Sequence, residues 1–167
     1  MTVEELLARE AIRHTLASYN IFADRLRVDE VVALFTEDGV LELEGAERGQ
    51  VIRHEGREAI GRFFGGMQGG GSAGRAPPAD PAPAPAPSAG PAARMFVRHH
   101  LSTSRIEFTG PDTAEGRSYF AVYTPAGPDH CGVYVDKFRR TDAGWLIALR
   151  QPRVDWRSPD SLFGGRR

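Results

Sequence analysis

The chain has 167 residues, a length typical of a single domain with one core. Its 21 lysines and arginines nearly balance 22 aspartates and glutamates, and no basic run interrupts this balance. A nucleic acid or an anionic membrane is therefore not an expected partner. The single cysteine, Cys131, excludes an internal disulfide and the usual cysteine-based zinc sites. No signal peptide and no apolar run of membrane-spanning length is recognisable, which predicts a cytoplasmic protein.

Helices and short strands are expected in the first part of the chain. Thr2 is a good N-cap, and Glu5 three residues later completes a capping box. Asp29 is expected to cap a second, shorter helix that runs through Phe35. The expected elements are a helix from Thr2 to about Asp24, a helix at 29–35, strands at 40–44 and 51–53, and a third helix at 56–64.

A segment at about 66–93 differs from the rest in composition. Gly, Pro and Ala dominate it, and it has no aromatic or β-branched side chain. Such a stretch cannot bury enough apolar surface to offset its ordering entropy, so it predicts a flexible insertion within one domain spanning 1–167. It could be a lid over a pocket or an inert insertion. The second reading is favoured because lids usually carry an apolar residue that docks.

Long strands follow the insertion, separated by turn residues. They are expected at 95–109, 113–124, 130–141 and 145–156, with turns at 110–112, 125–129 and 142–144. Helices followed by a long meander predict the α+β class. The expected architecture is a cone-shaped α+β barrel, with N-terminal helices packed on a curved antiparallel sheet that encloses a pocket. The pocket is the expected site.

Asp24 and His99 are the first candidates for catalysis. His99 and His100 are neighbours on a strand and point to opposite faces, which argues against a metal site built from both. On residue type alone, one histidine on a strand is more often structural than catalytic. Asp24 could be a solvated helix end, although its charge is unfavourable at the negative pole of a helix. A buried Asp and His brought together would form a general acid/base pair, because the carboxylate fixes the imidazole tautomer.

Tyrosines supply further candidates. Tyr19 either packs in the core or presents its hydroxyl to the pocket. Tyr119 and Tyr123 share one face of a strand, and Tyr134 lies on the next strand. Tyrosine rows are usually half-buried packing, but phenols that point into a pocket can donate hydrogen bonds to a carbonyl or enolate oxygen.

Five segments carry a resemblance to a known family: Tyr19–Asp24, Asp29–Val40, Gly56–Ile60, Arg98–Ser102 and Gly132–Trp145. They closely resemble the SnoaL-like branch of the nuclear transport factor 2-like superfamily. The resemblance covers nearly the whole chain outside the insertion and implies the cone-shaped fold. It does not identify a reaction, because this superfamily hosts dehydratases, isomerases, cyclases, dehydrochlorinases and non-catalytic subunits.

The nearest patterns resemble scytalone dehydratases and bile acid dehydratases. In both, a helix-end Asp pairs with a strand His, and Asp24 and His99 fall at those positions. The bile acid enzymes add a tyrosine five residues before the Asp, which is Tyr19 here. The ending Gln151–Trp156 is similar to that of scytalone dehydratase.

The chain departs from scytalone dehydratase in two places. A second histidine of that enzyme has no equivalent near Pro125 and Ala126. A Ser and Asn pair on the penultimate long strand is replaced by Gly132 and Tyr134. Substrate and leaving group are thus left open by the resemblance, while the Asp–His pair is retained.

The resemblance implies a cofactor-independent lyase of the dehydratase type, or an isomerase, that acts on a small hydrophobic oxygenated molecule. Its alternatives are a non-catalytic ligand-binding or assembly subunit and a polyketide cyclase. No metal and no cofactor are expected, and the chain is expected to form a homodimer or homotrimer. The expected catalytic residues are Asp24, His99 and Tyr19, and the expected substrate-binding residues are Tyr134, Tyr119, Tyr123 and Trp156.

Overall fold

The computed structural model describes residues 1–44, 49–68 and 96–163. The described part of the chain forms one mixed sheet with the strand order β2-β1-β6-β5-β4-β3. In chain order the elements are α1 (Val3–Ala23), α2 (Val28–Ala33), β1 (Phe35–Glu44), β2 (Val51–Glu55), α3 (Gly56–Gln68), β3 (Arg98–Gly110), β4 (Thr113–Thr124), β5 (Gly127–Thr141) and β6 (Gly144–Arg157).

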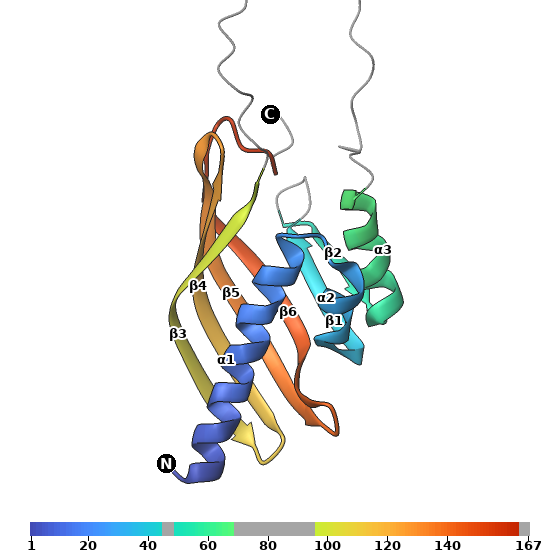
Figure 1. Cartoon of the computed structure of the whole chain (residues 1–167), viewed down its shortest axis with the longest axis vertical. Helices are drawn as coiled ribbons and strands as arrows, with labels where there is room; N and C mark the ends of the chain where they lie inside the picture. The colour runs from blue at the N-terminus through green and yellow to red at the C-terminus, as the bar shows by residue number, and fades with distance from the viewer. Residues whose placement is uncertain (45–48, 69–95, 164–167) are drawn as a thin grey trace, which may run out of the picture.

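The expected α+β fold is confirmed, since the helices lie on one side of a curved sheet (Figure 1). The four long strands β3 to β6 form the expected antiparallel meander. One pairing differs from the expected antiparallel sheet, because β1 runs parallel to β6. This parallel pairing joins the N-terminal part of the chain to the meander. The core lies between the helices and the sheet and includes Ile12, Leu16, Tyr19, Val31, Phe35, Leu41, Ile60, Phe64, Ile106, Phe138, Trp145 and Ile147.

Capping explains where α1 begins, but not where α2 begins. The amide of Glu5 donates to Thr2 Oγ1 at 3.1 Å, as the capping box predicts. The expected cap at Asp29 is wrong. The N-cap of α2 is Arg27, whose side chain makes no capping hydrogen bond, and Asp29 lies inside the first turn. The chain turns sharply after α1, with Leu26 at a φ of 53°, so α2 starts earlier than its acidic residue suggests.

The second helix ends earlier than expected and β1 starts earlier. Phe35 was expected to be helical, yet it begins β1 and pairs with Ile147 of β6. The amide of Ile147 also donates to the carbonyl oxygen of Leu34 at 2.8 Å. The parallel strand pairing therefore overrides the local helical pattern. A register shift between Phe35 and Val40 accommodates residues 36–39 within β1.

The turn between β4 and β5 is shorter than the expected 125–129. It contains only Pro125 and Ala126, and Gly127 already pairs with Thr124 at a φ of 106°. A side chain would be strained at this φ, which favours glycine there. As a result, residues 127–129 belong to β5 and not to a loop.

The expected insertion falls mostly outside the described residues. Its first residues, 66–68, continue α3, which is four residues longer than predicted. The remainder, 69–93, lies outside the part of the chain that the structure describes. The next described strand begins at Arg98, slightly after the predicted start at 95.

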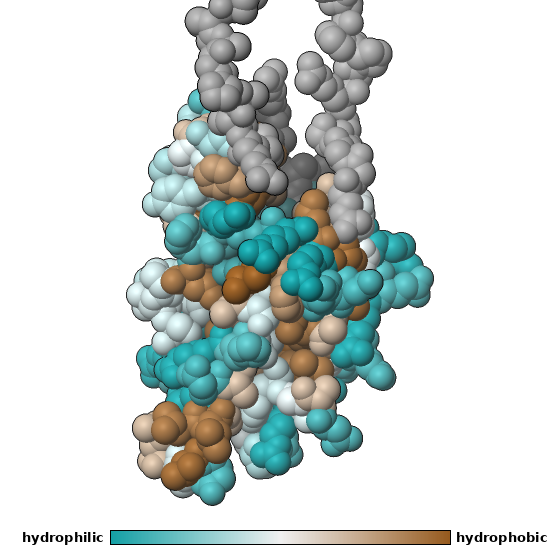
Figure 2. All heavy atoms as spheres, in the orientation of Figure 1, coloured by the Kyte–Doolittle hydropathy of each residue, from teal (hydrophilic) through white to brown (hydrophobic). Residues whose placement is uncertain are grey.

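Exposed apolar side chains gather at the start of α1. Figure 2 shows this patch at the lower end of the molecule, and it comprises Met1, Val3, Leu6 and Leu7.

No helix among the described residues is both long and apolar enough to cross a membrane.

Gly132 permits a close approach of β5 and β6. A Cβ at this position would lie 1.9 Å from the carbonyl oxygen of Arg153, a backbone atom that cannot move aside easily. We expect Gly132→Ala to lower the free energy of unfolding by about 1–3 kcal/mol, or to prevent folding. Urea denaturation measures the change. Gly65→Ala, at a helical glycine with nothing within 4 Å of the added Cβ, should be neutral or mildly stabilising. Equal stability of the two variants would contradict this account.

Candidate active site

Asp24 and His99 meet where α1 ends and β3 begins. The Oδ1 atom of Asp24 lies 2.5 Å from His99 Nδ1, and Oδ2 accepts a hydrogen bond from the His99 amide at 3.0 Å. The side chains are 6 % and 19 % exposed respectively. Because a carboxylate only accepts hydrogen bonds, it selects the tautomer with the proton on Nδ1. This leaves Nε2 of His99 able to accept a proton.

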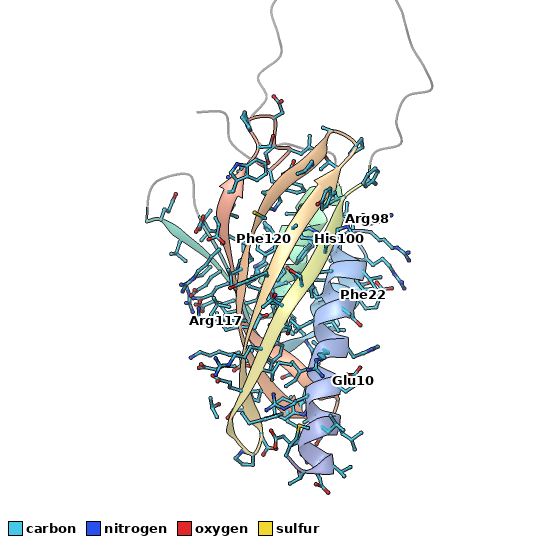
Figure 3. The ribbon with its side chains drawn as sticks, turned by 90° about the vertical axis from the view of Figure 1, so that its left-hand side faces the viewer. Glu10, Phe22, Arg98, His100, Arg117 and Phe120 are labelled. Carbon is cyan, nitrogen blue, oxygen red and sulfur yellow. The ribbon has the colours of Figure 1, made fainter. Side chains whose placement is uncertain are left out.

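Strand geometry places His99 on the inner side of the sheet. Its neighbour His100 is exposed and lies against the ring of Tyr123 at 5.2 Å on the outer side. Phe22 on α1 and the exposed residues Arg98 and His100 on β3 lie at the same end of the molecule (Figure 3). The described structure thus brings together the helix-end acid and the strand histidine.

A second histidine, His130, lies beside the first. The ring centroids of His99 and His130 are 6.2 Å apart, and the ring of Phe120 lies 6.4 Å and 5.8 Å from them. His99 and His130 both pair with Val122, from opposite sides. No equivalent of the second histidine of scytalone dehydratase was expected near Pro125 and Ala126, and the described structure places His130, a few residues further along the chain, beside His99. His130 was not recognised as a site residue because residues 125–129 were expected to form a turn. The actual turn is shorter, so His130 lies within β5 and not at its start.

His130 has its own acid, the preceding Asp129. The two side chains join through Asp129 Oδ1 and His130 Nδ1 at 2.6 Å, and both are buried. Adjacent strand residues normally point to opposite faces. Here Val122 pairs with His130 and Tyr123 pairs with Pro128, so Asp129 is the extra residue of a β-bulge. The bulge lets both side chains turn to the same place.

Burial and hydrogen bonds together set the pKa values of His130 and Asp129. Desolvation lowers the pKa of His130, and this outweighs the opposing hydrogen bond to Asp129. Burial alone would raise the pKa of Asp129. Hydrogen bonds from the Ser161 hydroxyl, the Leu162 amide and His130 instead hold that pKa below its ordinary value. The expected state at neutral pH is an ionised Asp129 beside a neutral His130.

A buried cation lies deeper in the core. Arg150 is fully buried and makes two hydrogen bonds to Asp136, at 2.9 Å and 2.8 Å. Its guanidinium lies over the rings of Tyr19 at 4.0 Å and Tyr134 at 4.2 Å. Its Nη1 atom has no hydrogen-bond partner among the described residues. The sequence reading did not single out Arg150, because an arginine on a strand usually lies in solvent.

Tyr19 and Tyr134 are both buried in this region. Burial raises the pKa of each phenol, so both remain protonated at neutral pH. Tyr134 stacks on Phe120 at 4.5 Å, and Phe120 contacts both histidines. A continuous aromatic layer therefore runs from the two histidines to the buried arginine.

Three of the expected substrate-binding residues lie elsewhere. Tyr119, Tyr123 and Trp156 are 53 %, 41 % and 49 % exposed. The inner positions of β4 are filled by Phe120 and Val122, so the alternating tyrosines face outward. The structure does not bring these three side chains to the Asp24–His99 pair. Among the described residues, no cluster of three or more His, Cys, Asp or Glu is placed to hold a metal ion.

Solved structures with this fold are similar in shape but remote in sequence. A proposed scytalone dehydratase from Novosphingobium aromaticivorans is 21 % identical, covers 99 % of both chains and has a TM-score of 0.66. A hexachlorocyclohexane dehydrochlorinase from Novosphingobium barchaimii is 15 % identical, with coverage of 93 % of this chain and 92 % of that chain and a TM-score of 0.66. At these identities the likeness shows the fold alone.

A third structure is a nuclear-transport-factor-2-like protein with a cystatin-like fold from Novosphingobium aromaticivorans. It is 22 % identical, with coverage of 98 % of this chain and 87 % of that chain and a TM-score of 0.65. No curated protein sequence matches the chain significantly. The SnoaL-like domain profile matches residues 4–151, which is most of the chain. The chain therefore belongs to the SnoaL-like domain family.

Proposed function

We propose that this chain is a cofactor-independent lyase of the dehydratase type, or an isomerase, that acts on a small hydrophobic oxygenated molecule. The single observation that carries the proposal is the contact of Asp24 with His99 Nδ1, which leaves Nε2 available. A half-buried Asp–His pair at the end of a helix is suited to general base catalysis. The dehydratases and dehydrochlorinases among proteins of this fold support the same class of chemistry.

Nε2 of His99 would remove a proton from the carbon next to a carbonyl group. The C–H electron pair then forms the enolate, and Asp24 stabilises the imidazolium that results. In a dehydratase, the enolate collapses, a C=C bond forms, and the β-hydroxyl leaves as water after taking a proton from the His99 imidazolium, which returns to its neutral state. In an isomerase, the proton returns to another carbon instead. His130, 6.2 Å from His99 between ring centroids, is the second group able to give or take a proton there.

The phenols would stabilise the enolate oxygen. Tyr19 and Tyr134 stay protonated, so each hydroxyl can donate a hydrogen bond to a developing negative charge. Arg150 lies over both rings, but Asp136 compensates its charge, so the phenol hydroxyls are the groups that would meet the enolate oxygen. The aromatic layer of Tyr134 and Phe120 fits a hydrophobic substrate better than a highly charged one.

Substitution of the Asp–His pair tests this mechanism. On a panel of β-hydroxy-ketones, with loss of water followed by absorbance of the enone, Asp24→Asn and His99→Gln should each reduce turnover by about 10²–10⁴-fold. Circular dichroism should show that both variants are folded. His100→Gln is the matched control, because His100 is the adjacent residue and faces outward.

Two outcomes would reject the mechanism. Full turnover by folded His99→Gln would show that His99 is not the base. An equal loss in His100→Gln would show that disturbance of β3, and not the missing imidazole, causes the effect.

The outer sheet face supports a second role, in assembly. We propose that it pairs with a second copy of this chain. Tyr119, Tyr123 and Trp156 are exposed there. Next to them, Arg105 pairs across strands with Arg117, and Glu107 pairs with Glu115. Within one chain these charges are compensated by the ion pairs of Arg105 with Glu107 and of Lys137 with Glu115. A two-fold axis between the rows would in addition place each basic pair against an acidic pair of the second copy.

Light scattering after size exclusion tests this pairing. The wild-type chain should have the mass of a dimer, and Tyr119→Arg should have the mass of a monomer. Ile21→Arg is the control, because Ile21 is an exposed apolar residue on α1, on the opposite side of the sheet. A monomeric wild-type chain, or a dimeric Tyr119→Arg variant, would contradict the proposed interface.

A further inference from the structure

Residues 158–163 follow β6, and all of their hydrogen bonds to the rest of the described chain go to one residue, Asp129. The Ser158 amide donates to the Asp129 carbonyl oxygen at 2.7 Å. The Ser161 hydroxyl donates to Oδ1 at 2.6 Å, and the Leu162 amide donates to Oδ2 at 2.8 Å. Among the described residues, every other hydrogen bond of this segment stays within it.

The same segment covers His130. The ring of Phe163 lies 5.3 Å from the ring of His130 between centroids, while Leu162 and Phe163 keep about half of their surface exposed. Asp129 Oδ1 accepts from both the Ser161 hydroxyl and His130 Nδ1, each at 2.6 Å. One carboxylate oxygen thus joins the segment to the imidazole.

We propose that Asp129 is a positioning residue that couples residues 158–163 to His130, so that the second histidine of the site is oriented and shielded only while this segment is in place. The bulge that turns Asp129 inward makes this coupling possible, since a regular strand would point its carboxylate away from His130. The segment has no strand partner, so it opens more easily than β5 or β6. The inference rests on the proposed function only in assigning His130 to the active site.

The charged and titratable groups around His130 define the expected change. Asp129 precedes it on β5, His99 faces it from β3 and Arg157 from β6, while Phe120 and Phe163 cover the ring without charge. Burial is the largest cause of its lowered pKa, and electrostatic interactions with His99 and Arg157 act in the same direction. Opening of the segment exposes the ring to water, so the pKa of His130 should rise toward its ordinary value of about 6.5.

Ser161→Ala tests the coupling in the full chain without any substrate. Hydrogen–deuterium exchange read by mass spectrometry reports both partners: backbone exchange in 158–163, and exchange at the imidazole C2 position of His130, whose pH dependence yields its pKa. We expect Ser161→Ala to speed backbone exchange of the segment several-fold and to raise the pKa of His130. Phe163→Ala should raise the same pKa by removing the cover.

Two controls make the result specific. Ser158→Ala removes a hydroxyl from the same segment that accepts only from the Asp160 amide, so the His130 titration should stay as in the wild type. Ser161→Thr keeps a hydroxyl and should restore the wild-type titration. Faster exchange of the segment with an unchanged His130 pKa would overturn the coupling, and so would unchanged exchange in Ser161→Ala.

These readouts are independent of the proposed reaction. An intact coupling in a chain that converts none of the hydroxy-ketones would reject the proposed function and leave this inference standing. Turnover that depends on His99, together with a His130 pKa that Ser161→Ala leaves unchanged, would reject this inference and leave the proposed function standing.

Discussion

The carboxylate of Asp24 joins two parts of the chain that lie 75 residues apart, the end of α1 and the start of β3. One oxygen binds the backbone of His99 and the other binds its ring, so the same side chain locates the strand and orients the imidazole. This position is electrostatically unfavourable for an acid, because the C-terminal end of a helix carries partial negative charge. An imidazolium formed during proton transfer would reverse that disadvantage. The helix end and the strand are therefore better matched to a reacting state than to the resting one.

Three acid pairs lie inside this domain, with aromatic side chains between them. Asp24 with His99, Asp129 with His130, and Asp136 with Arg150 each place an acid against a cationic or titratable partner. Burial of a charge is costly unless a partner compensates it. Phe120 and Tyr134 lie between the two histidines and Arg150. The titratable imidazoles are therefore at one end of the aromatic layer, and the Arg150–Asp136 ion pair is at the other. Such a separation is suited to moving a proton at the histidine end of the layer.

Much of the fold could be predicted from local patterns, because Thr2, the turn residues and the alternation along β4 act over a few residues. The errors occurred where distant pairing decides the structure. Phe35 joins a strand because Ile147 is beside it, and Asp129 enters β5 because of a bulge that no composition rule reveals. The Asp24–His99 pair was predictable from the resemblance to dehydratases of this superfamily, whereas residue type alone favoured a structural histidine. His130 was not, since its recognition required the correct length of one turn. Arg150 was not either, because its burial depends on Asp136 and two tyrosines that come together only in the folded sheet.

The orientation of the His99 ring is the central claim, and nitrogen-15 NMR of the imidazoles tests it most directly. Assignment uses the resonances that disappear in His99→Gln. The account predicts that neutral His99 carries its proton on Nδ1, with a downfield hydrogen-bonded proton that is lost in Asp24→Asn, and that Nε2 has the shift of an unprotonated nitrogen. A His99 ring protonated on Nε2 when neutral, or one whose shifts are unaffected by Asp24→Asn, would contradict the account, because Asp24 would then not present Nε2 as the base.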